Sequence, residues 1–510
     1  MTARRPRGSI AFVLHAHLPW LREPGDAVTL EERWFFEALW ECYLPILGVL
    51  QSLGDVKSGR PLLTVSISPT LLAMLRDPHL PARFERFAAD LDRLFAEKAK
   101  EHPEAVDDHR ARLEASRALL RRIRGDVTGA LVACAEDGLV ELATTAATHA
   151  FLPGLRTADA VRGQVRIGMR YFQKVTRRLP NVFWLPECGY DERLEGVLAD
   201  SGIQATVLAA HGLELARPRP PHRTDTPIVG DGPIAYFGRN NPLVDLVWSR
   251  EHGYPADPVY REFYSPADAD WSLKPLRITG FGGEKQRYEP ARAALRAEEH
   301  AAHFIQAATR ELDASEAAEP ITVVAFDAEL FGHWWWEGPK FLEVVLHGLA
   351  RTGQATSLGA YLDRDPVLPL AKPATSTWGR GGYAEVWTHP VSSHASRLVH
   401  RAEQRVLRVD AIVRDTPRTE TQRLARLWAI RELFLLQASD YAFMLRTGEF
   451  AGFAQRKLYE HAFAIDTLCD IASRPIETPG DRAMVEGWIR RRPVFEELDE
   501  DAWSDAFDPW

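Results

Sequence analysis

Two short motifs each place one acidic residue among several aromatic rings. Residues 183–190 read Phe-Trp-Leu-Pro-Glu-Cys-Gly-Tyr, and residues 323–338 read Val-Val-Ala-Phe-Asp-Ala-Glu-Leu-Phe-Gly-His-Trp-Trp-Trp-Glu-Gly. Each acid, Glu187 or Asp327, follows a short apolar run. Sugars offer flat C–H faces to aromatic rings, and glycosidic bonds are cleaved between two opposed carboxyl groups. The motifs therefore predict that Glu187 and Asp327 face each other across one sugar-binding pocket.

Histidines supply a second group of polar side chains. Residues 15–20 read His-Ala-His-Leu-Pro-Trp after an apolar run, so His15 and His17 point the same way if the strand continues. His149 has a similar setting in residues 147–153, Ala-Thr-His-Ala-Phe-Leu-Pro. Imidazoles at strand ends donate to sugar hydroxyls or to a carboxylate. A His-x-His pair with another histidine and acids is also a possible zinc-ligand set, which is the alternative interpretation.

Two further side chains close to Asp327 have open roles. Glu329 lies two residues later and falls on the same side if the strand continues, so it is the reserve candidate for the second acid. His333 is either a ligand of the pocket or a core histidine.

These motifs, in this order, resemble glycoside hydrolase family 57, which acts on α-glucans, over about residues 8–465. Residues 378–387, Trp-Gly-Arg-Gly-Gly-Tyr-Ala-Glu-Val-Trp, are similar to the last motif of that family. The resemblance implies Glu187 as nucleophile and Asp327 as acid/base of a retaining mechanism, with carboxyl groups about 5–5.5 Å apart. It implies no metal and no cofactor. It also implies the substrate-binding residues His15, His17, His149, Trp248, Trp378 and Trp387.

Within the family, the string at 247–264 resembles the 1,4-α-glucan branching enzymes. Such an enzyme cleaves an α-1,4 linkage with retention and transfers the chain to a 6-hydroxyl. In those enzymes a mobile loop carries a tyrosine over the cleft, and the register here puts Asp225 at that position. We therefore expect residues 213–240 to form a cover whose acidic side chain favours water over a sugar as acceptor.

Two smaller departures concern the acceptor side. Trp387-Thr-His stands where Trp-Leu-Asn is usual, and Arg380 stands where a glutamate is expected. Three functions remain in competition. The first is branching, the second is an α-glucan hydrolase or 4-α-glucanotransferase on the same site, and the third is a glucan-binding protein with little catalysis. The retained acids count against the third.

The composition argues against several other partners. Hydrophobic residues make up 45% of the 510 residues and charged residues 26%, which are globular values. A net charge of −9 without a Lys/Arg cluster argues against nucleic-acid binding. No run reaches about 18 apolar residues, so we expect no membrane span. The 4 cysteines lack metal-like spacing and suggest reduced thiols in a cytoplasmic protein. The partner that the family resemblance implies is an α-glucan.

Strand-like apolar runs, mostly separated by helical patterns, must position these residues. The runs lie at 10–14, 62–67, 139–143, 181–185, 205–208, 234–237 and 321–326. Their alternation with helices predicts a parallel α/β architecture, with the functional motifs at the carboxyl ends of strands. The family resemblance implies that this architecture is a (β/α)7 barrel.

We expect the chain to divide into a few regions. They are a catalytic barrel over 1–387, an inserted helical subdomain at 80–135, an active-site loop excursion at 213–275, and a C-terminal α-helical domain at 390–510. Helical patterns in the last region cover 396–413, 420–446 and 450–473.

Overall fold

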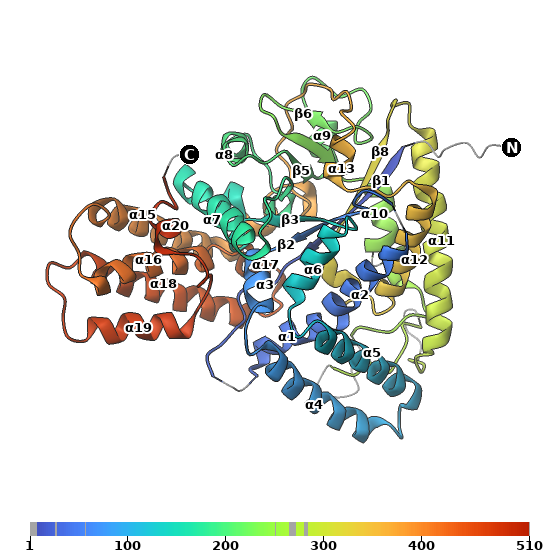
Figure 1. The fold of residues 1–510 in the computed structure, drawn as a ribbon, viewed down its shortest axis with the longest axis horizontal. Coiled ribbons are helices and arrows are strands. Elements are labelled where there is room, and N and C mark those ends of the chain that lie inside the picture. The colour runs from blue at the N-terminus through green and yellow to red at the C-terminus, as the bar shows by residue number, and fades with distance from the viewer. Residues whose placement is uncertain are drawn as a thin grey trace.

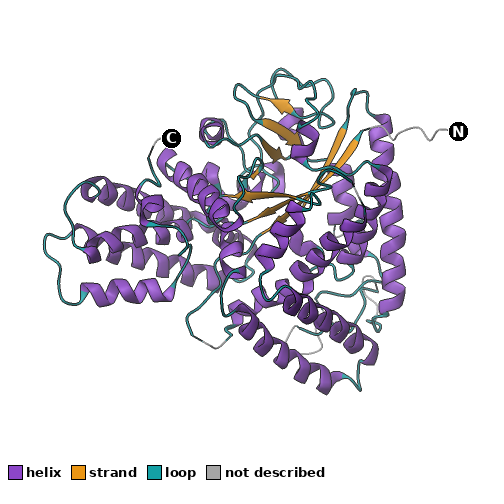
Figure 2. Ribbon diagram, viewed as in Figure 1, coloured by secondary structure: helices purple, strands orange, loops and turns teal. Residues whose placement is uncertain are grey.

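The computed structural model describes residues 8–25, 28–56, 58–249, 251–264, 272–279 and 284–508. It is a mixed α/β fold in which helices surround a central parallel sheet, and the helices of the C-terminal region pack together on one side (Figure 1). Strands are confined to the centre and one end of the larger body (Figure 2). Residue 250 and residues 265–271, within the predicted excursion, lie outside the described residues.

Seven predicted strand runs all coincide with observed strands. One sheet has the order β4-β3-β2-β1-β8, and a second has the order β5-β7-β6. The strands are β1 (Ser9–Ala16), β2 (Thr64–Ile67), β3 (Glu141–Thr145), β4 (Phe183–Trp184), β5 (Ala205–Leu208), β6 (Ile228–Val229), β7 (Ala235–Gly238) and β8 (Ile321–Asp327). All pair in parallel except the unpredicted β6, which is antiparallel to β7. Strands such as β1 are buried along their whole length, which explains their continuous apolar runs.

The register of the sheet brings the sequence motifs to one edge. His15 on β1 lies opposite Ser66 on β2 and opposite Asp327 on β8. Trp184, three residues before Glu187, lies opposite Thr145 on β3. Because all these strands are parallel, their carboxyl ends meet at the same edge, where active sites of such folds lie.

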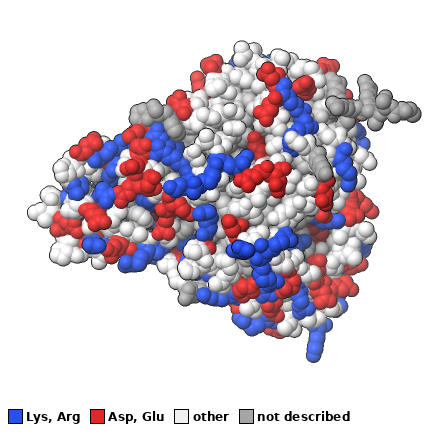
Figure 3. Space-filling model, in the orientation of Figure 1, with Lys and Arg blue, Asp and Glu red and all other residues white. Residues whose placement is uncertain are grey.

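Helices cover the sheet and fill the range predicted to be a helical insertion. They are α1 (Leu30–Ala38), α2 (Leu44–Ser52), α3 (Pro69–Leu75), α4 (Leu80–Lys98), α5 (Pro103–Arg122), α6 (Val127–Glu136), α7 (Ala158–Thr176), α8 (Leu194–Asp200), α9 (Ala210–Glu214), α10 (Asn241–Trp248), α11 (Pro290–Ala314), α12 (Gly338–Thr352) and α13 (Leu358–Leu362). The helix α1 begins at a capping box, in which Thr29 and Glu32 satisfy each other's backbone amides. Charged side chains of both signs are interspersed on the face shown in Figure 3.

The C-terminal region is helical, as the sequence predicts. It contains α14 (Glu385–Thr388), α15 (Ser393–Val413), α16 (Glu420–Leu436), α17 (Ser439–Thr447), α18 (Ala451–Ser473), α19 (Asp481–Arg491) and α20 (Glu500–Ser504). The predicted helix at 420–446 is interrupted, because residues 437 and 438 separate α16 from α17. At this break Ala438 forms a bridge with Ala150, and the Ser439 amide donates to the His149 carbonyl at 3.1 Å. The interruption therefore ties the C-terminal helices to the loop that follows β3.

The prediction that residues 213–240 cover the catalytic pair is wrong for the part that contains Asp225. The Ile321 amide donates to the Asp225 carbonyl at 2.9 Å, and Ile321 begins β8 whereas Asp327 ends it. Six residues of strand separate these ends, a distance of about 20 Å. Backbone hydrogen bonds also pin Arg217 to Lys372. Asp225 therefore lies at the opposite end of β8 from Asp327.

A π-helical turn, Leu39–Tyr43, packs against the loop that follows Asp327. Gly332 in this loop has φ +122°, and a Cβ there would overlap the backbone carbonyl oxygen of Glu41. The approach of the two backbones therefore requires glycine for both conformational and steric reasons.

We expect Gly332→Ala to destabilise the fold by at least about 3 kcal/mol, since strain and a backbone clash add. Gly353→Ala is the matched control: Gly353 also has positive φ, +73°, but nothing lies within 4 Å of the position that a Cβ would take there. That change should cost about 1 kcal/mol. Equal midpoints for the two variants in urea unfolding would show that the contact with Glu41 is not tight.

Candidate active site

Asp327 ends β8 at the edge where the motifs meet. Burial raises the pKa of its carboxyl group well above the ordinary value, and the neighbouring carboxylates of Glu329 and Glu187 raise it further. Arg239, which follows β7, opposes this shift. The Glu187 carboxylate is thus close enough to act on the pKa of Asp327. A shared pocket with a separation of about 5–5.5 Å stays a prediction.

Glu187 sits on a strained turn directly after β4. Its backbone has φ +64°, and the next residue, Cys188, has φ +48°. Both are left-handed conformations that non-glycine residues rarely adopt, and such strain concentrates at functional sites. The turn aims the carboxylate at two donors: the Trp378 indole N–H donates to Oε2 and the Ser439 hydroxyl donates to Oε1, each at 2.9 Å.

The surroundings of the two acids differ in a way that separates their protonation states. Burial raises the pKa of Glu187, but its hydrogen bonds from Trp378 and Ser439 act in the opposite direction. For Asp327, burial and two like charges act together. The hydrogen bonds to Glu187 therefore favour its ionised form, whereas the neighbouring carboxylates favour the protonated form of Asp327. A pair with one ionised and one protonated carboxyl is what retaining glycoside cleavage requires.

The three predicted histidines form one stacked cluster beside Glu187. His15 is 1% exposed, and its ring nitrogens are hydrogen-bonded to Ser66 and to His149. His149 is 4% exposed and reaches Ser439 through Nδ1 at 2.9 Å. The His17 ring lies on the His149 ring with centroids 3.9 Å apart. The structure thus gathers all three, while their role as substrate ligands stays a prediction.

The zinc alternative can be tested on the geometry of this cluster. Ligand atoms of His17, His149 and Asp440 lie within 4.8 Å of one another. However, the two imidazole rings are stacked with an interplanar angle of 18°. An ion bound at about 2.0–2.1 Å lies in the plane of each ligating imidazole, and it cannot lie in two stacked planes at once. These residues, as placed, do not fit a shared metal ion.

Glu329 and His333 connect the pocket to the π-helical turn. Glu329 is 6% exposed and accepts hydrogen bonds from the Tyr43 hydroxyl, at 2.5 Å, and from the His17 amide, at 3.0 Å. His333 is hydrogen-bonded to the fully buried Glu41 at 2.7 Å. Both side chains therefore hold the loop after β8 against its neighbours.

The predicted aromatic residues occupy different environments. Trp248, which is 45% exposed, packs edge-on against the 41% exposed Trp334 at 6.1 Å, so these rings present an open aromatic corner. Trp378 donates to Glu187. Trp387 is 4% exposed and stacks on Phe151 at 4.7 Å. Contact of these tryptophans with substrate stays a prediction.

Ser439 and Asp440 are site residues that the sequence analysis did not find. Ser439 donates to Glu187, and the Asp440 carboxylate pairs with His17 Nε2 at 3.1 Å. Both lie at the start of α17, inside a stretch whose helical pattern runs on without a break. The only available signal is the pair of short polar residues itself, which is common on any helix.

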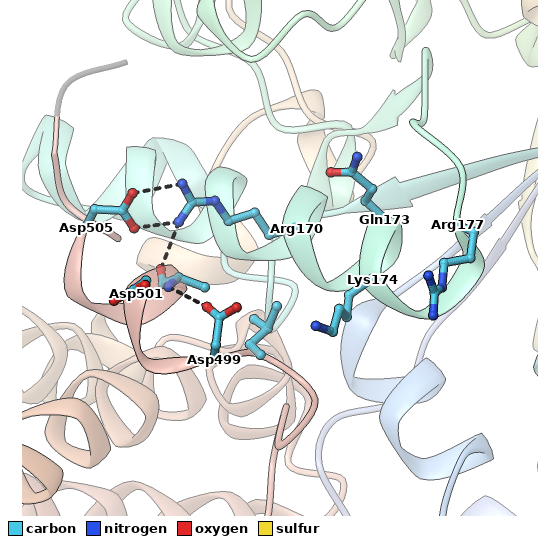
Figure 4. Close-up of a pocket in the computed structure, with 9 residues that line it drawn as sticks. Arg170, Gln173, Lys174, Arg177, Asp499, Asp501 and Asp505 are labelled. Atoms are coloured by element: carbon cyan, nitrogen blue, oxygen red, sulfur yellow. Dashed lines mark hydrogen bonds and ion pairs between the residues drawn. The ribbon is translucent and has the colours of Figure 1, made fainter.

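One cavity of the structure lies away from these residues. An open cleft of about 670 Å³ separates α7 from the segment that carries α20 (Figure 4). Arg170 bridges it by an ion pair with Asp505, while Lys174 and Arg177 point into it beside Asp499 (Figure 4). It holds cations and carboxylates together but none of the aromatic side chains of the catalytic pocket.

Comparison with known proteins agrees with this geometry. A model of glycosyl hydrolase family 57 matches residues 11–358, and a model of the C-terminal region of 1,4-alpha-glucan branching enzymes matches residues 398–503. A 1,4-alpha-glucan branching enzyme from Thermococcus kodakarensis is 30% identical over 89% of this chain and 72% of its own length.

Two solved structures are similar over nearly the whole chain. One is a GH57-type branching enzyme from Pyrococcus horikoshii, with a TM-score of 0.89 and 28% identity over 97% of this chain and 96% of that one. The other is the alpha-amylase AmyC from Thermotoga maritima, with a TM-score of 0.85 and 28% identity over 98% and 99%. Buried acids at the carboxyl edge of a parallel sheet, together with these similarities, define a carbohydrate-active enzyme. The chain belongs to glycosyl hydrolase family 57.

We expect Trp378→Phe to lower kcat/KM for glycoside cleavage by about 10- to 100-fold, because Glu187 loses a charge-assisted hydrogen bond. The acidic limb of the pH profile should move to higher pH, since the lost donor no longer lowers the pKa of Glu187. Trp503→Phe, in α20, is the control, because Trp503 is buried and its indole N–H has no hydrogen-bond partner among the described residues. Equal losses in both variants would contradict a specific role for the Trp378 donor.

We expect Glu329→Gln to move the alkaline limb of the same profile to lower pH. The Glu329 carboxylate raises the pKa of Asp327, so its neutralisation lets Asp327 lose its proton earlier. The amide keeps an oxygen for Tyr43, which limits structural damage. An alkaline limb that stays in place or rises would show that Asp327 is not the group whose deprotonation ends activity.

Proposed function

We propose that the chain is a 1,4-α-glucan branching enzyme. It cleaves an α-1,4 linkage with retention and transfers the released chain to a 6-hydroxyl, forming an α-1,6 branch. The observation that carries the proposal is the completion of the pocket by Ser439 and Asp440, which lie within the match to the branching enzymes' C-terminal region. The hydrogen bond from Ser439 joins that region to Glu187, the proposed nucleophile.

In this mechanism Glu187 attacks the anomeric carbon while Asp327 gives its proton to the leaving glycosidic oxygen. A covalent glycosyl-enzyme forms, and the cut chain departs with a new hydroxyl. Asp327, now ionised, takes the proton from the 6-hydroxyl of an acceptor glucan, which attacks the same carbon and frees Glu187. Two inversions give net retention. The half-exposed pair Trp248 and Trp334 offers an apolar face for a sugar ring beside this chemistry.

A second candidate is hydrolysis of α-glucans on the same site, with water in place of the 6-hydroxyl. The similarity to an alpha-amylase at a TM-score of 0.85 supports it. The sequence argument from Asp225 no longer does, because that residue lies at the far end of β8.

Three finer features belong to the same proposal. Parallel bridges between Val182 and Ala205 and between Arg239 and Val323 support closure of the seven parallel strands into a (β/α)7 barrel. The division into regions 1–387, 80–135, 213–275 and 390–510 remains our working description of the chain. We also propose that the enzyme is cytoplasmic and acts on a glycogen-like glucan. In this proposal it binds no nucleic acid and needs no cofactor or metal. No helix among the described residues is long and apolar enough to cross a membrane.

The proposal predicts that the protein converts amylose into a product with α-1,6 linkages and few new reducing ends. Both quantities should be measured in one reaction, by debranching analysis and by a reducing-end assay. Glu187→Gln and Asp327→Asn should abolish both signals, whereas Asp225→Tyr should leave their ratio unchanged. Reducing ends without branches would establish the hydrolase. The absence of both signals would rule out catalysis on amylose.

A further inference from the structure

A chain of hydrogen bonds runs from β2 to the side chain of Glu187. The Ser66 hydroxyl meets His15 Nδ1 at 3.2 Å, and His15 Nε2 meets His149 Nε2 at 2.9 Å. His149 Nδ1 meets the Ser439 hydroxyl at 2.9 Å, and that hydroxyl meets Glu187 Oε1 at 2.9 Å. Every ring nitrogen of the two histidines is used, and both rings are at least 96% buried.

The count of protons fixes the direction of every bond in this chain. Ionised Glu187 can only accept, so Ser439 must donate its single proton to it. The Ser439 oxygen then accepts from His149, which must carry its proton on Nδ1. Burial and neighbouring histidines lower the pKa of both His15 and His149 well below the ordinary value, so each ring is neutral and carries one proton. His149 Nε2 is therefore an acceptor, and His15 carries its proton on Nε2.

We propose that Ser439, His149 and His15 form a directional hydrogen-bond relay that holds Glu187 in its ionised form, with His149 as the Nδ1–H tautomer and His15 as the Nε2–H tautomer. Ser66 closes the relay by donating to His15 Nδ1. In this arrangement the two histidines are positioning residues that act through Ser439. The inference rests on the proposed function only in assigning Glu187 as the nucleophile.

Some of the surroundings of Glu187 oppose the effect of the relay on the pKa of its carboxyl group. Asp440 lies beside Glu187 and raises the pKa of its carboxyl group, as burial does. His17, which pairs with Asp440, and the Trp378 N–H act in the opposite direction. Asp327, at the end of β8, and the thiol of the adjacent Cys188 also couple electrostatically to Glu187.

Of these groups, only the relay reaches the Glu187 oxygen that Trp378 leaves free. A proton added at Oε1 of Glu187 would remove the acceptor of the Ser439 hydroxyl, and if Ser439 then donated to His149 Nδ1, both imidazoles would have to change tautomer. The direction of the relay is therefore matched to ionised Glu187.

The direct test is the tautomer of each ring. Two-bond nitrogen–proton NMR spectra of the full-length protein, labelled with ¹⁵N-histidine, distinguish Nδ1–H, Nε2–H and cationic rings. The protein has 17 histidines, so the two signals are assigned by their loss in His15→Gln and His149→Asn. At pH 7 we expect His149 as Nδ1–H and His15 as Nε2–H. An Nε2–H tautomer at His149, or a cationic ring at either position, overturns the proposal.

Amide substitutions test the same direction through activity. A Gln side chain places an N–H near the position of Nε2, and an Asn side chain places it near Nδ1. His15→Gln should therefore keep at least roughly tenfold more activity than His15→Asn, since one buried hydrogen bond is at stake. The comparison is made at His15 because it lies on an extended strand, whereas His149 has φ +56°, which favours Asn on its own account. Equal activity, or the reverse order, contradicts the relay.

Ser439 provides the third arm. Ser439→Ala should move the acidic limb of kcat/KM to higher pH, and Ser439→Thr, which keeps the hydroxyl, should restore it. Ser473→Ala, at the end of α18, is the control for loss of a helical serine hydroxyl. A purely structural role would lower the rate without moving the limb, and that result overturns the proposal.

Fluoride release from α-maltosyl fluoride is the readout, because hydrolysis and transfer both produce it. Wild type that releases fluoride but makes no branches rejects the branching function and leaves the relay testable. Wild type that releases no fluoride rejects Glu187 as nucleophile, while the tautomers still report on the relay.

Discussion

The burial of the Glu187 carboxyl group is the constraint on which this structure depends. A charged group removed from water is costly unless donors replace its hydration. Glu187 receives two, from Trp378 and Ser439, which come from different parts of the chain. The strained turn at Glu187 is tolerated because both donors hold its side chain. Sheet register, the break between α16 and α17 and the loop that carries Trp378 all serve to bring these groups together.

Much of the fold follows from local pattern. The seven strand runs were predictable because strands buried on both faces are continuously apolar, and the helices because their apolar residues recur at helical spacing. The sequence did not predict β6, because a strand of only two residues shows no periodicity. The sequence also did not predict the break at 437–438, because no glycine or proline lies there. A backbone contact with the loop after β3 causes it, and no local pattern encodes such a contact.

The place of Glu187 and Asp327 at strand ends and the cluster of histidines were predictable for a different reason. Acids and imidazoles that follow apolar runs must gather where parallel strands end. Ser439 and Asp440 could not be found this way, since their place depends on how the C-terminal helices dock. The position of Asp225 was misjudged because an unpatterned segment can lie at either end of a sheet, and only its hydrogen bonds to Ile321 and neighbouring strands decide which.

The docking of α17 also determines when, during synthesis of the chain, the groups around Glu187 can be completed. A chain leaves the ribosome from its N-terminus, and its early elements fold first. Both predicted catalytic carboxyl groups are present once residue 327 has emerged, yet the nucleophile lacks its second donor until residue 439 follows. A nascent sheet therefore holds both acids before the hydrogen bonds to Glu187 are complete. The chain can fold around its carboxyl groups before it can replace the water that hydrates them.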